Sequence, residues 1–71
     1  MNTFRGDIMN YTHFKSLPTV RDKVKYLLAI VKTCRHFGIK DDSDIKRVIK
    51  VHCNNDETVM KILNLALDQV R

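Results

Sequence analysis

The residues from Pro18 to Gly38 constrain the fold most strongly, because their apolar positions recur with the period of an α-helix. The apolar side chains of this stretch lie mostly three or four positions apart: Val20, Val24, Leu27, Leu28, Val31 and Cys34. This spacing predicts one long helix over about residues 18–37, with one buried side. Pro18 suits its first turn, Thr19 opens a sequence that resembles a capping box, and Gly38 suits its end.

The same stretch carries a second pattern beside its apolar side. At about 100° per residue, four side chains fall together on one strip. These side chains are Arg21, Lys25, Lys32 and His36. Residues 1–40 hold eight Lys and Arg against two acids, whereas residues 41–71 hold five against six, within a net charge of +5. A localised basic surface of this kind attracts phosphate backbones or acidic protein surfaces, unless it serves only to keep the chain soluble.

Shorter patterns flank the long helix. Tyr11, Phe14 and Leu17 recur every three residues, which predicts a short helix that ends before Pro18. Beyond Gly38, three N-cap residues precede a third helix that runs to about Cys53. The cap candidates are Asp41, Asp42 and Ser43, the inner face is Ile45, Val48, Ile49 and Cys53, and the outer face is Lys46, Arg47 and Lys50.

The last helix, over about residues 56–70, is the most apolar segment of the chain. Its predicted inner side consists of Val59, Ile62, Leu63, Ala66 and Val70. Met60 and Leu67 widen that side, and Leu65 lies nearly opposite it. A helix with apolar residues over so much of its surface is either wrapped by other helices or presents a surface to a partner.

These patterns predict an all-α fold: a small bundle of three to four helices with one long central helix and a helix-turn-helix-like C-terminal pair. We expect one helical domain over residues 10–71, after an extended or flexible arm over residues 1–9. A chain of 71 residues buries only about 60% of its unfolded surface, which leaves no room for a second domain or a deep pocket.

Residues 44–64 resemble the lac-repressor type of helix-turn-helix over about 20 residues. Val48, Val59 and Ile62 match its apolar positions, and Thr58-Val59 stands where that type often has the same pair. The resemblance implies a second helix that enters the major groove of DNA.

The same segment departs from that pattern in four ways. Ile49 replaces a small residue, Cys53 replaces the turn glycine, and Asn54 replaces an apolar residue. The second helix also opens with Asp56-Glu57, which phosphates repel. Two angled helices joined by a short turn also occur in any small helical bundle, so both interpretations stay open.

Enzyme, metal and membrane functions lack support in the sequence. There is no Gly-rich phosphate loop, no nucleophile beside a recognisable base, and no zinc-ligand spacing around Cys34 and Cys53. No apolar run approaches the roughly 20 residues of a membrane span, and the N-terminus lacks the apolar core of a signal peptide. We therefore expect a cytoplasmic, non-catalytic protein without a cofactor, a bound metal, a membrane partner or a small-molecule substrate.

Two hypotheses for a regulatory binding function follow. In the first, nucleic acid, either DNA or structured RNA, binds the basic helix face together with residues of the third helix. The predicted contacts are Arg21, Lys25, Lys32, His36, Lys46 and Lys50. In the second, the protein is an inhibitor or adaptor that docks on a partner through Met60, Leu65 and Leu67 of its last helix. An acidic protein surface as the partner and a homodimer are both open.

Overall fold

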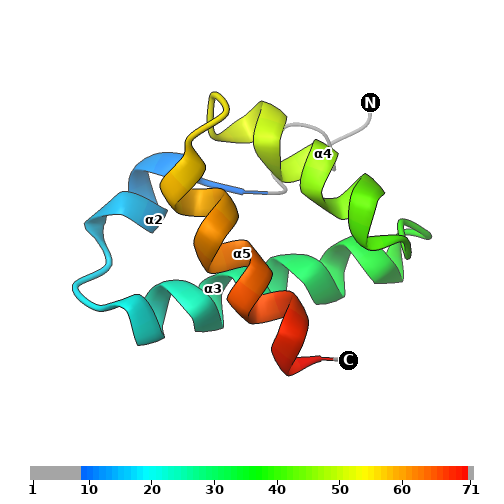
Figure 1. The fold of residues 1–71 in the computed structure, drawn as a ribbon, viewed down its shortest axis with the longest axis horizontal. Helices are drawn as coiled ribbons and strands as arrows, with labels where there is room; N and C mark the ends of the chain where they lie inside the picture. Colours follow the sequence, from blue (N-terminus) through cyan, green and yellow to red (C-terminus); the bar gives the residue numbers. More distant parts are fainter. Residues whose placement is uncertain (1–8, 71) are drawn as a thin grey trace.

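Four α-helices and no β-strand make up residues 9–70, the part of the chain that the computed structural model describes. The helices are α2 (Tyr11–Ser16), α3 (Val20–His36), α4 (Asp42–His52) and α5 (Glu57–Gln69). In Figure 1, α3 runs across the lower part of the molecule, α5 crosses it, and α4 lies above its C-terminal end. The predicted all-α bundle with a long central helix is confirmed, and residues 1–8 of the arm predicted over residues 1–9 lie outside the described residues.

Local hydrogen bonds fix both ends of α3. The Thr19 hydroxyl accepts a hydrogen bond from the backbone N–H of Asp22 at 3.0 Å, so the helix begins at Val20. Pro18 therefore lies before the cap and not in the first turn, because Thr19 takes the cap position. At the other end Gly38 has φ of +94°, and the backbone N–H groups of Gly38 and Ile39 donate to carbonyls of the last turn. This is the hydrogen-bond pattern of a Schellman motif, which glycine favours.

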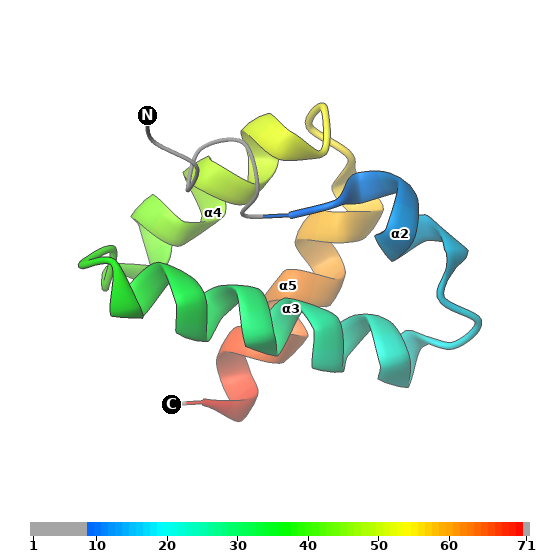
Figure 2. The ribbon, with the colours of Figure 1, turned by 180° about the vertical axis from the view of Figure 1, so that it is seen from behind.

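One apolar core joins the four helices. Its centre is the contact in which α5 packs across α3, and α4 packs against α5 (Figures 1 and 2). The buried apolar residues are Met9, Phe14, Val24, Leu27, Ile30, Val31, Cys34, Ile45, Ile49, Cys53, Val59, Ile62, Leu63, Ala66 and Leu67. Burial of these side chains is the main favourable term in folding a domain of this size.

Two positions of α3 differ from the predicted core face. Val20 was expected inside but is 57% exposed, because the first turn of α3 lies to the side of the crossing with α5 (Figure 1). Ile30 was not expected inside and is buried. Tyr26 lies one turn before Ile30 on the same side of α3, and its ring lies 6.2 Å from that of Phe14 in α2. The contact with α2 therefore adds Tyr26 to the side of α3 that packs against the core.

The short helix α2 attaches the start of the described chain to the core. Phe14 is buried, and the backbone N–H of Asn10 donates to the Tyr26 hydroxyl at 2.8 Å. Met9 is buried as well, at 6% exposed. Met9, the last residue of the predicted arm, therefore contributes its side chain to the core.

The turn between α4 and α5 depends on two asparagines. Asn54 and Asn55 have φ of 55° and 62°, in the left-handed region that asparagine tolerates better than most residues. Asp56 then caps α5, and its carboxylate accepts from the N–H of Thr58 at 2.9 Å. Asp56 was expected as the first helical residue, but its side chain is needed as the cap and α5 begins at Glu57.

A matched pair of leucines in α5 tests the assignment of the core. Leu63→Ala removes a side chain that is 0% exposed, and we expect it to lower the free energy of unfolding by about 2–5 kcal/mol. Leu65→Ala makes the same change at a side chain that is 50% exposed and should cost under about 1 kcal/mol. Urea unfolding followed by circular dichroism measures both values, and equal losses would contradict the placement of Leu63.

Candidate nucleic-acid interface

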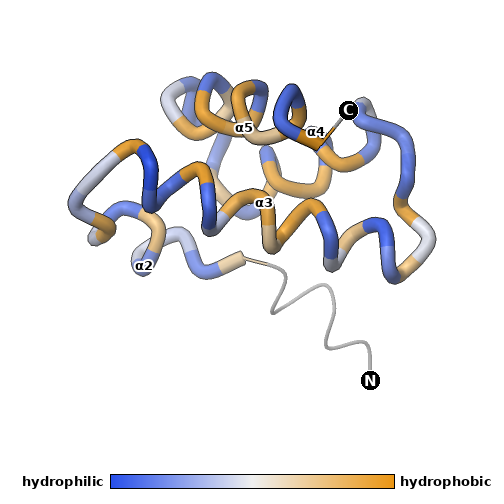
Figure 3. The backbone as a smooth tube through the Cα atoms, turned by 90° about the horizontal axis from the view of Figure 1, so that it is seen from below, coloured by the Kyte–Doolittle hydropathy of each residue, from blue (hydrophilic) through white to orange (hydrophobic). Residues whose placement is uncertain are grey.

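The four predicted basic residues of α3 form one exposed strip along the helix. All four side chains are exposed: Arg21, Lys25, Lys32 and His36. The first and last residues of the strip lie fifteen positions apart, or about 22 Å at 1.5 Å per residue. Figure 2 shows α3 in the foreground with no other helix in front of it, and Figure 3 shows hydrophilic and hydrophobic residues alternating along its length. We call these four residues the basic strip.

The positive charge of the basic strip is not neutralised by carboxylates of the described chain. Two ion pairs occur within residues 9–70, Arg35 with Asp42 at 3.4 Å and Arg47 with Asp44 at 3.6 Å. Neither of them uses a residue of the basic strip. The only acidic residue of α3 is Asp22, in the first turn, where the helix dipole favours negative charge. The strip therefore presents its cations to solvent and to any anionic partner.

Lys46 and Lys50, the other two predicted nucleic-acid contacts, lie on a separate surface. They belong to α4 and line an open groove of about 350 Å³ against the start of α5. The groove is lined by Ser43, Lys46, Arg47, Lys50 and Met60. No residue of the basic strip lines it, so the six predicted contacts divide between two surfaces. We call the second one the α4–α5 groove.

The predicted partner surface on α5 does not assemble. Leu67 is 1% exposed, so its assignment as a docking residue is wrong. It follows Leu63 by one helical turn and faces the core with it. Leu65 is half exposed on another side of α5, and Met60 lines the α4–α5 groove. Of the three predicted residues, Met60 is the one that lines the α4–α5 groove.

The start of α5 is a poor place for a phosphate backbone. Asp56 accepts hydrogen bonds from the Tyr11 hydroxyl and from the Thr58 backbone, and both lower the pKa of its carboxyl. The same contact raises the pKa of the Tyr11 hydroxyl. Glu57, the next residue, is exposed. Two carboxylates at the end that would enter the major groove repel phosphates, so the basic strip is the better candidate interface.

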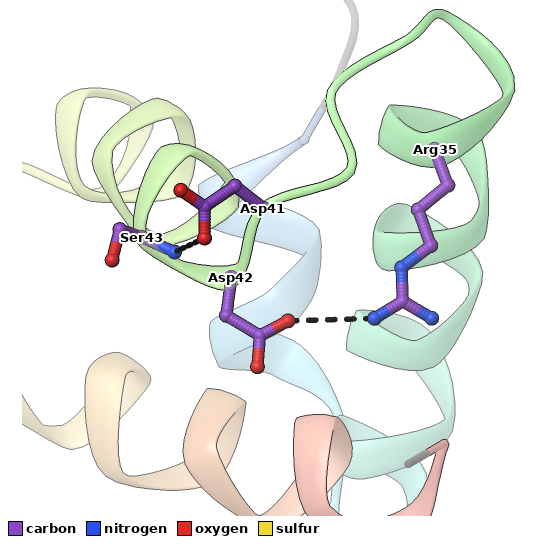
Figure 4. A network of polar contacts seen from close by, with 4 residues as sticks. All are labelled: Arg35, Asp41, Asp42 and Ser43. Carbon is purple, nitrogen blue, oxygen red and sulfur yellow. Dashed lines mark hydrogen bonds and ion pairs between the residues drawn. The ribbon is translucent and has the colours of Figure 1, made fainter.

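The ion pair between Arg35 and Asp42 was not foreseen from the sequence. Figure 4 shows Arg35, in the last turn of α3, pointing toward Asp42 in the first turn of α4, with Asp41 capping α4 through the N–H of Ser43. Both side chains of the ion pair are about one-third exposed, at 36% and 34%. This contact joins α4 to α3 across the loop around Gly38. It also directs the Arg35 guanidinium toward α4.

The cysteines and histidines do not gather into a metal site in residues 9–70. Within that range no three His, Cys, Asp or Glu side chains are grouped so that they could hold a metal ion. Cys34 and Cys53 are free and buried, and burial raises the pKa of the Cys34 thiol. None of the four described helices combines the length and the apolar character needed to cross a lipid bilayer.

Comparison of the chain with protein-family models, with curated proteins and with solved structures finds no match. The resemblance of residues 44–64 to a lac-repressor helix-turn-helix stays a prediction for the same reason. A functional proposal for this chain therefore depends on the geometry and charge of its own residues.

The link between Tyr11 and Asp56 predicts a pH-dependent contribution to stability. A carboxyl whose pKa is lowered by folding stabilises the native state above its ordinary pKa of 3.8, and this contribution is lost as the pH falls through the lowered value. We expect Tyr11→Phe to destabilise the fold at pH 7, and the difference from wild type to shrink below about pH 4. Urea unfolding at a series of pH values measures it.

Tyr26→Phe is the matched control for this prediction. The Tyr26 hydroxyl accepts from the backbone N–H of Asn10 and has no carboxylate partner. Loss of this hydroxyl should lower the free energy of unfolding by the same amount at pH 7 and at pH 3.5. The lower pH lies about 0.3 pH units below the ordinary carboxyl pKa of 3.8. Parallel pH profiles for the two variants would contradict a role for Asp56 in the effect.

Proposed function

We propose that this protein is a small, non-catalytic regulator of the cytoplasm that binds the phosphate backbone of duplex DNA or structured RNA through the basic strip. The observation that carries the proposal is the exposure of all four strip residues on one side of α3, without a carboxylate partner in the described chain. Cations in this arrangement gain affinity when they displace the counterions of a nucleic acid.

The length of the basic strip suits a duplex. The major groove of a duplex is about 12 Å wide and the minor groove about 6 Å, so a row of about 22 Å is long enough to reach the phosphates on both sides of a groove. The strip residues are spaced four, seven and four positions apart, at about 6, 10 and 6 Å along α3. Lysine and arginine side chains at these spacings are able to contact phosphates of both strands.

The composition of the strip favours backbone contact over reading of bases. Lysine and arginine contacts with phosphates position a protein on a duplex and carry little sequence information. Single strands are bound mainly by stacking of bases on aromatic side chains, and none of the four strip residues is Phe, Tyr or Trp. We therefore expect this surface to bind duplex regions of a nucleic acid, with a weak preference for sequence.

Two variants of equal net charge test the proposal. Lys25→Glu/Lys32→Glu reverses charge on the basic strip, and Lys46→Glu/Lys50→Glu reverses it in the α4–α5 groove. Fluorescence anisotropy with a labelled DNA duplex and a labelled RNA hairpin, over a series of salt concentrations, measures affinity. For the wild type we expect a plot of log affinity against log salt with a slope of about −3, from Arg21, Lys25 and Lys32.

The strip variant should bind at least about tenfold more weakly and reduce that slope by about two, because two phosphate contacts are lost. The groove variant should keep most of the affinity and the wild-type slope. Circular dichroism checks that both variants fold. Absence of binding by the wild type at low salt, or equal losses in the two variants, would overturn the proposal.

A further inference from the structure

The α4–α5 groove combines positive charge with an apolar wall, which the basic strip does not. Its basic residues, Lys46, Arg47 and Lys50, lie along one side of α4, and Met60 enters from α5. The proposed function leaves this surface unused. We infer that the groove binds an acidic amphipathic helix of a partner protein, with carboxylates against the three cations and one apolar side chain against Met60.

Charge complementarity is the first argument for this occupant. Three of the five lining residues among the described part of the chain are cationic and none of the five carries a carboxylate, and Asp56 and Glu57 at the start of α5 are not among them. The nearest ion pair joins Arg47 to Asp44 at 3.6 Å, with the side chains 77% and 52% exposed. Exposed pairs of this kind are weak and screened by salt, so Arg47 can exchange Asp44 for a carboxylate of the partner.

Met60 provides the second argument, because its apolar side chain favours a protein partner over a nucleic acid. Its side chain is half-buried and packs against the core cluster, while its remaining surface lines the groove. An unbranched thioether adapts its shape to an incoming apolar group, which is why methionines are frequent on helix-binding surfaces. A phosphate backbone offers no apolar group at this position, and no lining residue is aromatic.

The dimensions of the groove suit a helix with one apolar anchor. Lys46 and Lys50 lie one helical turn apart, which matches carboxylates four residues apart on a partner helix. A volume of about 350 Å³ is small for a ligand pocket and holds one large apolar side chain. The partner therefore presents one leucine-sized residue between acidic residues on the same helix face.

Titration of the full ¹⁵N-labelled chain with a synthetic helical peptide tests the inference. The peptide carries glutamates four residues apart on both sides of one leucine, and a second peptide has serine in place of that leucine. We expect the largest amide shift changes at residues 43–50 and at Met60. The serine peptide should bind at least about fivefold more weakly, because it buries less apolar surface.

Variants of the chain locate the contact. Lys46→Glu/Lys50→Glu should weaken binding of the leucine peptide at least about tenfold, since like charges then face each other. Met60→Gln, of similar length but polar, should abolish the preference for the leucine peptide. Lys25→Glu/Lys32→Glu has the same net charge as the groove variant and should change affinity for the peptide less than about threefold.

Four outcomes would overturn the inference. They are absence of peptide binding at low salt, shift changes confined to α3, equal affinity for the two peptides, and equal losses in the two charge-reversed variants. A groove variant that loses binding of the DNA duplex as fully as the strip variant would also overturn it, because the groove would then belong to a nucleic-acid surface. Failure of the basic strip to bind nucleic acid leaves these peptide measurements unaffected.

Discussion

The contact between α3 and α5 is the constraint on which the rest of the structure depends. In a chain of this size only one core is possible, and the crossing of these two helices provides its centre. Once the apolar side of α3 is covered by α5 and α2, the side that carries Arg21, Lys25 and Lys32 has to face solvent. The interaction that stabilises the fold therefore also determines which surface is offered to an anionic partner.

Helical periodicity predicted the elements well because their signals are local. Thr19 and Gly38 were identified as the ends of the long helix, and both make the expected backbone arrangement. Periodicity also predicted most of the buried residues, but it gives only the side of a helix that is apolar. It does not say how far a neighbouring helix extends, which is why Val20 was placed inside the core.

The two candidate sites also differ in how far the sequence predicts them. The basic strip lies within one helix, so the relative positions of its residues follow from helical geometry and the sequence predicts them. The α4–α5 groove exists only because two helices pack at a particular angle. Lys46 and Met60, which both line it, were therefore assigned from the sequence to different partners. The link from Tyr11 to Asp56 joins residues 45 positions apart and has no local signal at all.

Two basic surfaces on one small chain raise the question of how they distinguish their ligands, since nucleic acids and acidic proteins carry the same sign of charge. Long-range attraction brings either ligand to either surface and cannot separate them. Selectivity has to come from short-range features, and here the surfaces differ. The basic strip is a row of polar and charged side chains along one helix, which suits a phosphate backbone. The groove places Met60 beside its cations, so a ligand without an apolar group leaves that wall in contact with water. The two surfaces share no residue, so under the two proposals we expect that a substitution in one leaves the other in place.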